Sequence, residues 1–258
     1  AGAASVTYSL PGGTAAGSGP MVNTTGPVGQ NQAQVAFLAD GGFVVPWTNY
    51  TGISSDGNPT GGDIFSQRYT AGGAKVGGET LVNTTTANEQ DSSTIIGLAD
   101  GGYVITWDSF GQDGDRYGEY GQRYDSTGAK LGGEIHISTT TTGSQDTSSM
   151  AALPPNAALA FAGGLVVVYS SATAFDDQGF ATHYDVLMQR YDTSGVAVGP
   201  ETRVNTTTPG NQDYPSVPAL AGGYVVTWGE ESPWCQSDMG PQPPDTRNPS
   251  PPRGRPPA

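Results

Sequence analysis

Residues 81–135 read LVNTTTANEQDSSTIIGLADGGYVITWDSFGQDGDRYGEYGQRYDSTGAKLGGEI, and the same pattern returns on both sides of this stretch. The distances between its landmarks are nearly constant. The Tyr of each Q-R-Y motif precedes the polar residue of the next N/S-T-T motif by 14 residues, and that residue precedes the end of the next Q-D pair by 8. The second Gly of each G-G pair precedes a large aromatic residue by 5. A repeat of about 55 to 65 residues is one supersecondary unit that buries its core against its neighbours.

Each copy is predicted to contain four strands. In the copy quoted above, these strands cover residues 93–99, 103–107, 120–124 and 135–137. β-Branched and aromatic residues recur along them, and the turns D-G-G and D-S-T-G supply the Gly residues that accept positive φ. Four antiparallel strands per copy, joined by short links, are typical of a β-propeller blade, whereas the rungs of a parallel β-helix are shorter.

The order of the copies predicts an all-β propeller of four blades. Complete copies span about residues 23–82, 83–137 and 138–204. A fourth copy begins at residue 205 and its pattern stops after Trp228, while residues 1–22 resemble the end of a copy. These N-terminal residues are therefore predicted to complete the last blade, which would remove the exposed edges of an open array. The alternative is that the chain is a piece of a longer array.

The last residues do not follow the repeat. Nine of the 20 Pro residues fall between Pro233 and Pro257, and Arg residues gather in the same stretch. Such a composition does not form a sheet, so residues 1–229 are predicted to be the propeller and residues 230–258 an extended tail.

Composition limits the classes of function. The chain has 39 Gly, 20 Pro and only 13% charged residues, which argues against a helical protein. Its net charge of −14 argues against nucleic acid or an anionic membrane as a partner. A single cysteine, Cys235, excludes an internal disulfide, and the sequence has no stretch apolar enough to predict membrane insertion.

The motif V-N-T-T-T…Q-D…L-A-D-G-G-Y-V-I-T-W…G-Q-D-G…Y-G-Q-R-Y-D at residues 82–125 resembles the repeat found in tandem in large secreted proteins of alphaproteobacteria, often beside calcium-binding or adhesin-like repeats. The resemblance covers about residues 5–228. It implies a secreted, extracellular propeller-type module with no established catalytic residue. Pro46, Tyr169 and Asn31 depart from the pattern.

The Q-D pairs are the first candidate metal site, formed by Asn31, Asp91, Asp146 and Asp213. Each lies at the entrance to the strand that would be innermost in its blade, so the four would form a ring of oxygen atoms at one mouth of the channel. Hard cations such as Ca²⁺ bind clusters of this kind. The alternative is that each Gln-Asp pair hydrogen-bonds its own turn and ties it to the next blade.

The loop from Asp108 to Gly121 is the second candidate calcium site. Asp108, Asp113 and Asp115 alternate there with Gly residues, although the full calcium-loop pattern is absent. The alternative is a solvated acidic turn.

Two further sets of residues are candidate ligand contacts. The aromatic residues at the ends of the second strands could stack on sugar rings or fill the core between blades; they are Trp47, Trp107, Tyr169 and Trp228. The Q-R-Y arginines, Arg68, Arg123 and Arg190, could bind a ligand or pair with a carboxylate such as the Asp of a Q-D pair.

No residues single out a catalytic site. His136 and His183 do not recur in the repeat, and carboxylates are abundant without any one pair standing out. The sequence therefore predicts a secreted, non-enzymatic interaction module for cell-surface or matrix adhesion, with a protein or glycan partner and Ca²⁺ as cofactor. A lectin-like sugar-binding propeller is the alternative, and a carboxylate-based hydrolase is the third hypothesis.

Overall fold

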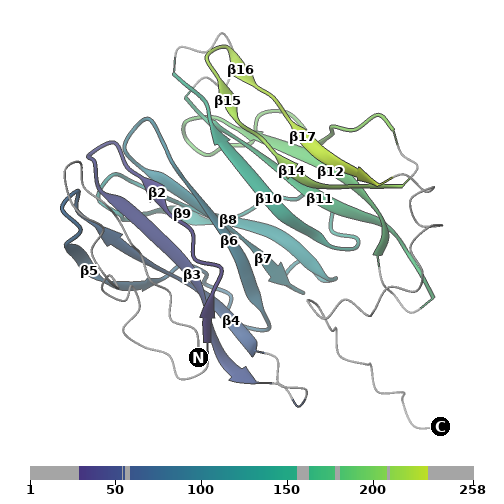
Figure 1. The fold of residues 1–258 in the computed structure, drawn as a ribbon, viewed down its shortest axis with the longest axis horizontal. Helices are drawn as coiled ribbons and strands as arrows, with labels where there is room; N and C mark the ends of the chain where they lie inside the picture. Colours follow the sequence, from purple (N-terminus) through teal and green to yellow (C-terminus); the bar gives the residue numbers. More distant parts are fainter. Residues whose placement is uncertain are drawn as a thin grey trace, which may run out of the picture.

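The computed structural model describes residues 29–53, 55, 59–155, 163–177, 181–207 and 210–231, which form 17 strands. These strands pair antiparallel in successive sheets that follow one another along the chain (Figure 1). The expected N-terminal strands in residues 1–22 lie outside the described residues, as does most of the expected tail at residues 230–258. The predicted start of that tail is wrong by two residues, because Glu230 and Glu231 extend β17 and pair with β14. None of the described residues forms a helix with the length and apolar character needed to cross a membrane.

The first three sheets share one topology. The first consists of β1 (Gly29–Asn31), β3 (Phe43–Ile53), β4 (Pro59–Tyr69) and β5 (Lys75–Leu81), with β2 (Ala36–Phe37) paired to β3. The second consists of β6 (Gln90–Gly97), β7 (Tyr103–Phe110), β8 (Tyr117–Tyr124) and β9 (Lys130–His136). The third consists of β10 (Gln145–Ala152), β11 (Leu165–Phe175), β12 (Ala181–Tyr191) and β13 (Thr202–Arg203). The predicted four-stranded antiparallel unit is confirmed.

The fourth copy is shorter. Here β14 (Asn211–Ser216) pairs with β17 (Thr227–Glu231), and β15 (Ala219–Leu220) pairs with β16 (Gly223–Tyr224). We refer to these strands together as the fourth sheet. The described sheets form a propeller-like fan, and no closure between the first and the fourth is seen among the described residues (Figure 1).

The G-G pair is explained by the turn between the first two strands of each sheet. Gly101 has a φ of +86°, and the turn is closed by a 2.8 Å hydrogen bond from the Leu98 amide to the Gly102 carbonyl. A side chain at Gly102 would collide with the carbonyl oxygen of Tyr124, the Tyr of Q-R-Y. The first Gly thus permits the turn, and the second permits close packing on the third strand.

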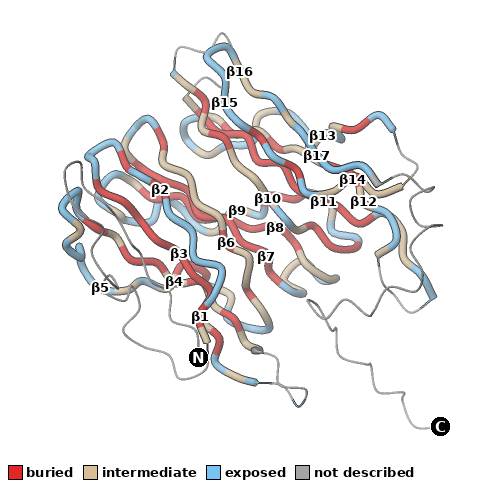
Figure 2. Tube along the Cα trace, viewed as in Figure 1, coloured by how far each residue is buried: buried red, intermediate tan, exposed pale blue. Residues whose placement is uncertain are grey.

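The hydrophobic core lies between the sheets. One cluster joins Ile64 and Val82 of the first copy to Ile105 and Trp107 of the second. Equivalent clusters join the second copy to the third and the third to the fourth. Figure 2 shows the buried residues concentrated along the middle strands. Each copy therefore buries its apolar face against a neighbour, as the repeat predicts.

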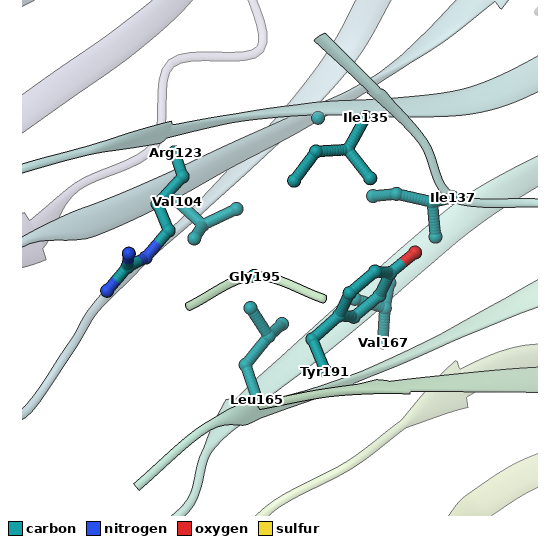
Figure 3. A pocket seen from close by; sticks show the side chains of 9 residues that line it. Val104, Arg123, Ile135, Ile137, Leu165, Val167, Tyr191 and Gly195 are labelled. Carbon is teal, nitrogen blue, oxygen red and sulfur yellow. The ribbon is translucent and has the colours of Figure 1, made fainter. Parts of the chain in front are cut away.

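Packing between the second and third sheets leaves a small apolar hollow. Its side chains come from β7, β8, β9, β11, β12 and the segments beside them, and include Ile135, Leu165 and Tyr191 (Figure 3). Because aliphatic groups make up most of this lining, the hollow is a feature of core packing and not a polar ligand site.

Glutamates at the outer strands of the second and third sheets hold the links that lead into those same sheets. Glu134 of β9 accepts a hydrogen bond from the Thr84 amide in the link that leads into the second sheet. Glu201, which precedes β13, accepts a 3.0 Å bond from the Thr139 amide in the next link. These contacts hold the first strand of each sheet in place, and that strand carries the Q-D pair.

Candidate functional site

Three carboxylates lie side by side across the second sheet. In the antiparallel register, Asp91 of β6 is opposite Asp108 of β7, and Asp108 is opposite Glu119 of β8. Residues that are directly opposite in such a ladder have Cβ atoms about 5 Å apart. We call Asp91, Asp108 and Glu119 the carboxylate row.

The other described sheets do not have this row. The equivalent positions are Asn31, Thr48 and Ile64 in the first sheet, and Asp146, Ser170 and Val186 in the third. Asp213 of the fourth sheet is opposite Gly229. Glu119 therefore stands where the other two complete sheets carry a buried aliphatic side chain.

Burial increases along the row. Asp91 and the neighbouring Asp146 are partly exposed, whereas Asp108 is 5% and Glu119 is 0% exposed. No hydrogen bond of normal geometry from the described residues reaches either Glu119 carboxylate oxygen or Oδ1 of Asp108. Buried carboxyl oxygens that lack such a bond are costly to the fold, and such oxygens are typical of a site kept for function.

The row also holds protons near neutral pH. Burial raises the pKa of Asp91 to about 7, and the charges of Glu89 and Asp146 contribute to the shift. Burial raises the pKa of Glu119 to about 7, and short side-chain contacts of hydrogen-bond type with Asp108, Ser148 and Thr106 partly offset this rise. Burial raises the pKa of Asp108 well above its usual value, and the charges of Glu119, Asp146 and Asp91 raise it further.

Asp146 enters the same site from the third sheet. Burial raises its pKa to about 6, with a hydrogen bond from Thr147 opposing the shift and the charge of Asp213 adding to it. Near neutral pH the site therefore combines protonated and ionised carboxyl groups. That combination suits general acid–base catalysis.

The residue after every Q-D pair has an unusual backbone conformation, and in three of the four sheets it lies in a β-bulge. The residues immediately after the pairs have left-handed φ values between +53° and +56°, although none is Gly; they are Gln32, Ser92, Thr147 and Tyr214. The strand register shifts at this point in the second, third and fourth sheets. A non-Gly residue in this conformation is strained by about 1 to 3 kcal/mol, and such strain gathers at functional sites. The sequence analysis missed these bulges.

Tyrosines surround the carboxylates. Burial raises the pKa of Tyr117, and the charges of Asp91 and Glu89 raise it further. Burial likewise raises the pKa of Tyr184, and the charges of Asp146 and Asp213 raise it further. The ring of Tyr117 also packs edge-on against Phe110 with 5.0 Å between the ring centroids. Aromatic surfaces therefore lie next to the acidic groups.

Residues at the Q-D pairs form hydrogen bonds of the kind expected if the pairs are structural and do not bind a metal. Gln90 donates a 3.0 Å hydrogen bond to the Ala87 carbonyl of its own turn, and Gln145 does the same to Thr142. Gln32, the residue after the first pair, joins the next copy by accepting a 2.9 Å bond from the Ser92 amide. Within the described ranges, no three His, Cys, Asp or Glu side chains are arranged to hold a metal ion. Calcium binding at Asn31, Asp91, Asp146 and Asp213 stays a prediction.

The second candidate calcium loop is occupied by internal contacts. Asp113 accepts a 3.2 Å hydrogen bond from the Asp115 amide, and Asp115 accepts one of 2.9 Å from the Gly143 amide. Asp108 lies in β7, outside the loop, as a member of the row. Calcium in this loop likewise stays a prediction.

The candidate aromatic residues lie mostly in the core. Trp47, Trp107 and Tyr169 are at most 1% exposed, a burial that favours the core interpretation, while Trp228 of the fourth sheet is 36% exposed.

The arginines pair with a different carboxylate from the expected one. Arg68 bonds Asp40 at 2.8 Å and Arg123 bonds Asp100 at 2.5 Å, so both reach the D-G-G turn. Pairing with the Asp of Q-D is therefore wrong for these two, because Q-R-Y lies at the opposite end of its strand. Arg190 packs close to Gly199.

Glu119 was missed by the sequence analysis, although a signal for it exists. It precedes the Tyr of Q-R-Y by 5 residues, as Ile64 and Val186 do in their copies. The other copies fold with an aliphatic residue at this position, so the fold does not require a charged residue there. A glutamate at this position therefore indicates a functional role.

Comparison with solved structures supports the propeller architecture. The chain is similar to a Hadza microbial sialidase, with a TM-score of 0.50 and 12% identity; the match covers 78% of this chain and 46% of the sialidase. It is also similar to an endo-arabinase from Bacteroides thetaiotaomicron (TM-score 0.44, 13% identity, covering 76% and 68%). A GH43 protein from Bacillus licheniformis matches with a TM-score of 0.40 and 9% identity, covering 73% of this chain and 34% of that one. No family model and no curated protein matches the sequence.

These matches correct the expected function. The prediction of a non-enzymatic adhesion module is corrected by the match with a TM-score of 0.50, which is a sialidase. At about 10% identity the likeness shows the fold alone.

Proposed function

We propose that this protein is a carbohydrate-active enzyme that hydrolyses glycosidic bonds at the carboxylate row. The observation that carries the proposal is the row itself: three carboxylates on adjacent strands of the one complete sheet that has them, with Glu119 and Asp108 buried and short of hydrogen bonds. Glycoside hydrolysis requires one carboxyl group that donates a proton and another that accepts one. The sialidase, endo-arabinase and GH43 matches point to the same class of reaction.

Asp91 is the proposed general acid. It is partly exposed, so it can reach a substrate, and its pKa of about 7 keeps it protonated at slightly acidic pH. In the reaction its proton passes to the leaving-group oxygen as the bond from that oxygen to the anomeric carbon breaks. Asp108 and Glu119 are the proposed positioning groups, because Asp108 lies opposite Asp91 in the strand register and Glu119 lies opposite Asp108.

Asp146 is the proposed base. Its lower pKa of about 6 leaves it ionised when Asp91 is still protonated. It takes a proton from the water that attacks the anomeric carbon, so the net result is the addition of water across the broken bond. At the end of the reaction Asp91 is ionised and Asp146 is protonated. The different protonation states of the two carboxyl groups come from their environments alone, as in other paired-carboxylate sites.

A panel of aryl glycosides tests the function. Wild-type protein is expected to hydrolyse at least one substrate, with kcat/KM highest between about pH 6 and 7, because the base must be ionised and the acid protonated. Asp91→Asn is expected to lose at least 100-fold of this activity, within the range of about 10² to 10⁴ for a general acid.

Asp125→Asn is the matched control for this experiment. Asp125 follows β8 at the end away from Glu119 and accepts hydrogen bonds within its own turn. It is expected to keep wild-type activity. Equal losses in both variants, or no turnover across the panel, would contradict the proposal.

We further propose that residues 1–22 complete the fourth sheet and close a four-bladed ring. The first sheet carries an apolar cluster of Phe43, Val45, Trp47 and Tyr69 that corresponds to the face by which the second sheet packs on the first. Leu220 and Val225 of the fourth sheet are exposed. Both surfaces suit a closing contact.

Deletion of residues 1–22 tests this closure. The truncated protein is expected to unfold at a temperature lower by several degrees, because exposed apolar faces lose their cover. Deletion of residues 232–258 is the control and is expected to leave the midpoint unchanged. An unchanged midpoint in the first variant would show that these residues do not complete the fold.

A further inference from the structure

A carboxylate recurs at one position of the first and third sheets, and in both it has polar partners. Asp63 and Asp185 each stand six residues before the Tyr of Q-R-Y. Asp63 accepts a 2.7 Å hydrogen bond from the Asn83 side chain, and Asp185 accepts one of 2.7 Å from Asn205. Arg203 adds a cation 3.4 Å from Asp185. The carboxylates at this position are therefore supplied with hydrogen-bond donors.

The second sheet builds the same place from different residues. Gly118 stands six residues before its Tyr, and a Cβ atom on it would lie 2.8 Å from Oδ2 of Asp113. Asp113, from the loop after β7, thus brings its carboxylate to the space that an Asp side chain takes in the other two sheets. Ser138 stands where those sheets carry Asn, and His136 stands where the third sheet carries Arg.

This exchange leaves the Asp113 carboxylate short of donors. Its side chain is 1% exposed, and its Oδ2 has no hydrogen-bond partner among the described residues. Its Oδ1 accepts a 3.2 Å bond from the Asp115 amide. A buried carboxylate oxygen without a partner is costly unless a donor or a cation reaches it. The Asp113 side chain is therefore suited to a bound cation.

Two further ligand atoms lie beside this carboxylate. Nε2 of His136 is 3.9 Å from Asp113 Oδ2 and 3.2 Å from Ser138 Oγ. The Ser138 hydroxyl accepts a 3.3 Å hydrogen bond from the Glu119 amide, which fixes its position. The His136 ring is stacked on Tyr120, with 4.5 Å between the ring centroids. One nitrogen and two oxygen atoms are thus held in place by the sheet.

The spacing of these atoms suits a small divalent ion. Zn²⁺ holds nitrogen and oxygen ligands at about 2.0 to 2.2 Å in a tetrahedral arrangement, which places the ligand atoms about 3.4 Å from one another. The observed separations of 3.2 and 3.9 Å lie on either side of this value. The His136 side chain is 34% exposed, so an ion can reach it from solvent.

The His136 ring is in the protonation state that binds a metal. Burial lowers its pKa, and the charges of Asp113 and Glu201 oppose this shift. The ring is therefore neutral at pH 7. A neutral imidazole nitrogen is a ligand for zinc, copper and nickel, whereas Ca²⁺ and Mg²⁺ prefer oxygen atoms alone.

We propose that Asp113, His136 and Ser138 form a binding site for a divalent transition-metal ion such as Zn²⁺. Two of the three ligands are of the His, Cys, Asp or Glu type, and the serine hydroxyl is the third. The site differs in its ligands from the calcium loop expected from the sequence, and it shares no residue with the carboxylate row. The bound ion would join the loop after β7 to β9. The inference does not depend on the proposed hydrolase activity.

Zinc titration of the full, metal-stripped chain without an affinity tag tests the site. Zn²⁺ is expected to raise the thermal midpoint by several degrees, and Ca²⁺ at the same concentration is expected to have no such effect. Isothermal titration calorimetry is expected to detect zinc binding that His136→Leu and Asp113→Asn each weaken by at least about 10-fold. The first of these variants introduces the residue that the first sheet carries at this position, Leu81.

His183→Gln and Cys235→Ser are the matched controls, because they remove the other histidine and the only thiol. Both are expected to keep the wild-type zinc affinity. His136→Arg introduces the residue of the third sheet, so it is expected to raise the midpoint in the absence of zinc and to abolish the zinc response. Zinc affinity that is unchanged in His136→Leu and Asp113→Asn, or an equal response to Ca²⁺, would overturn the proposed site.

Discussion

Glu119→Gln is expected to raise the thermal midpoint at pH 8 while reducing glycoside hydrolysis by about 10- to 100-fold. The folded-state pKa of Glu119, about 7, lies above its ordinary value of 4.5. Its contribution to stability is therefore complete below about pH 4.5 and is lost as the pH rises through 7. At pH 8 the buried side chain is ionised, and replacing it with a neutral isostere removes that cost.

The size of the gain follows from the pKa shift. One pKa unit corresponds to about 1.4 kcal/mol, so the gain at pH 8 is of the order of 3 kcal/mol and the midpoint rises by several degrees. At pH 4 the variant and the wild type are expected to have similar midpoints. Differential scanning calorimetry across this pH range measures both.

A reciprocal exchange is the control for Glu119. Glu119→Ile introduces the residue that the first sheet carries at this position and is expected to stabilise at pH 8. Ile64→Glu buries a carboxylate where the row is absent and is expected to destabilise by about 3 kcal/mol or more. A lower midpoint for Glu119→Gln at pH 8 would mean that the fold requires the charge, and the functional interpretation of the row would fail.

Trp107→Ala is expected to lower the free energy of unfolding by about 3 to 5 kcal/mol, the range for removing a buried aromatic side chain. Trp107 is fully buried in the cluster between the first and second copies, beside Ile64 and Val82. Its loss leaves a cavity that neighbouring sheets cannot fill without moving. Urea unfolding followed by circular dichroism measures the effect.

Trp228→Ala is the matched control. Trp228 occupies the same position in the repeat but is 36% exposed, so its removal is expected to cost no more than about 1 kcal/mol. Stability that is unchanged in Trp107→Ala, together with a loss of glycan binding, would support sugar stacking and contradict the core assignment.

The architecture could be predicted from the sequence because the repeat fixes its spacing. The G-G pair and the residues after it predicted the first turn and the second strand, and the structure explains both Gly residues by a positive φ and a close approach to Tyr124. Strand ends were less accurate. The first strand begins at Gln90, before Ser93, because the bulge at Ser92 lets pairing continue on both sides of it.

The candidate site could not be predicted by the same method. A search for residues that recur in every copy finds what the fold needs, whereas Glu119 and Asp108 occur in one copy and replace residues that the others share. The sequence also does not state which carboxylates meet across neighbouring sheets. The expectation of a non-enzymatic module arose because only residues that recur in the copies were considered as site candidates.

The most direct test of the central claim compares equivalent rows in two sheets. Steady-state hydrolysis of a neutral aryl glycoside is measured for the triple variant Asp91→Asn, Asp108→Asn and Glu119→Gln, and for the double variant Asn31→Ala and Thr48→Ala in the first sheet. We expect the triple variant to fall to the uncatalysed rate and the double variant to keep most of the wild-type rate. Full activity in the triple variant, or equal losses in both, would contradict the assignment of catalysis to the second sheet.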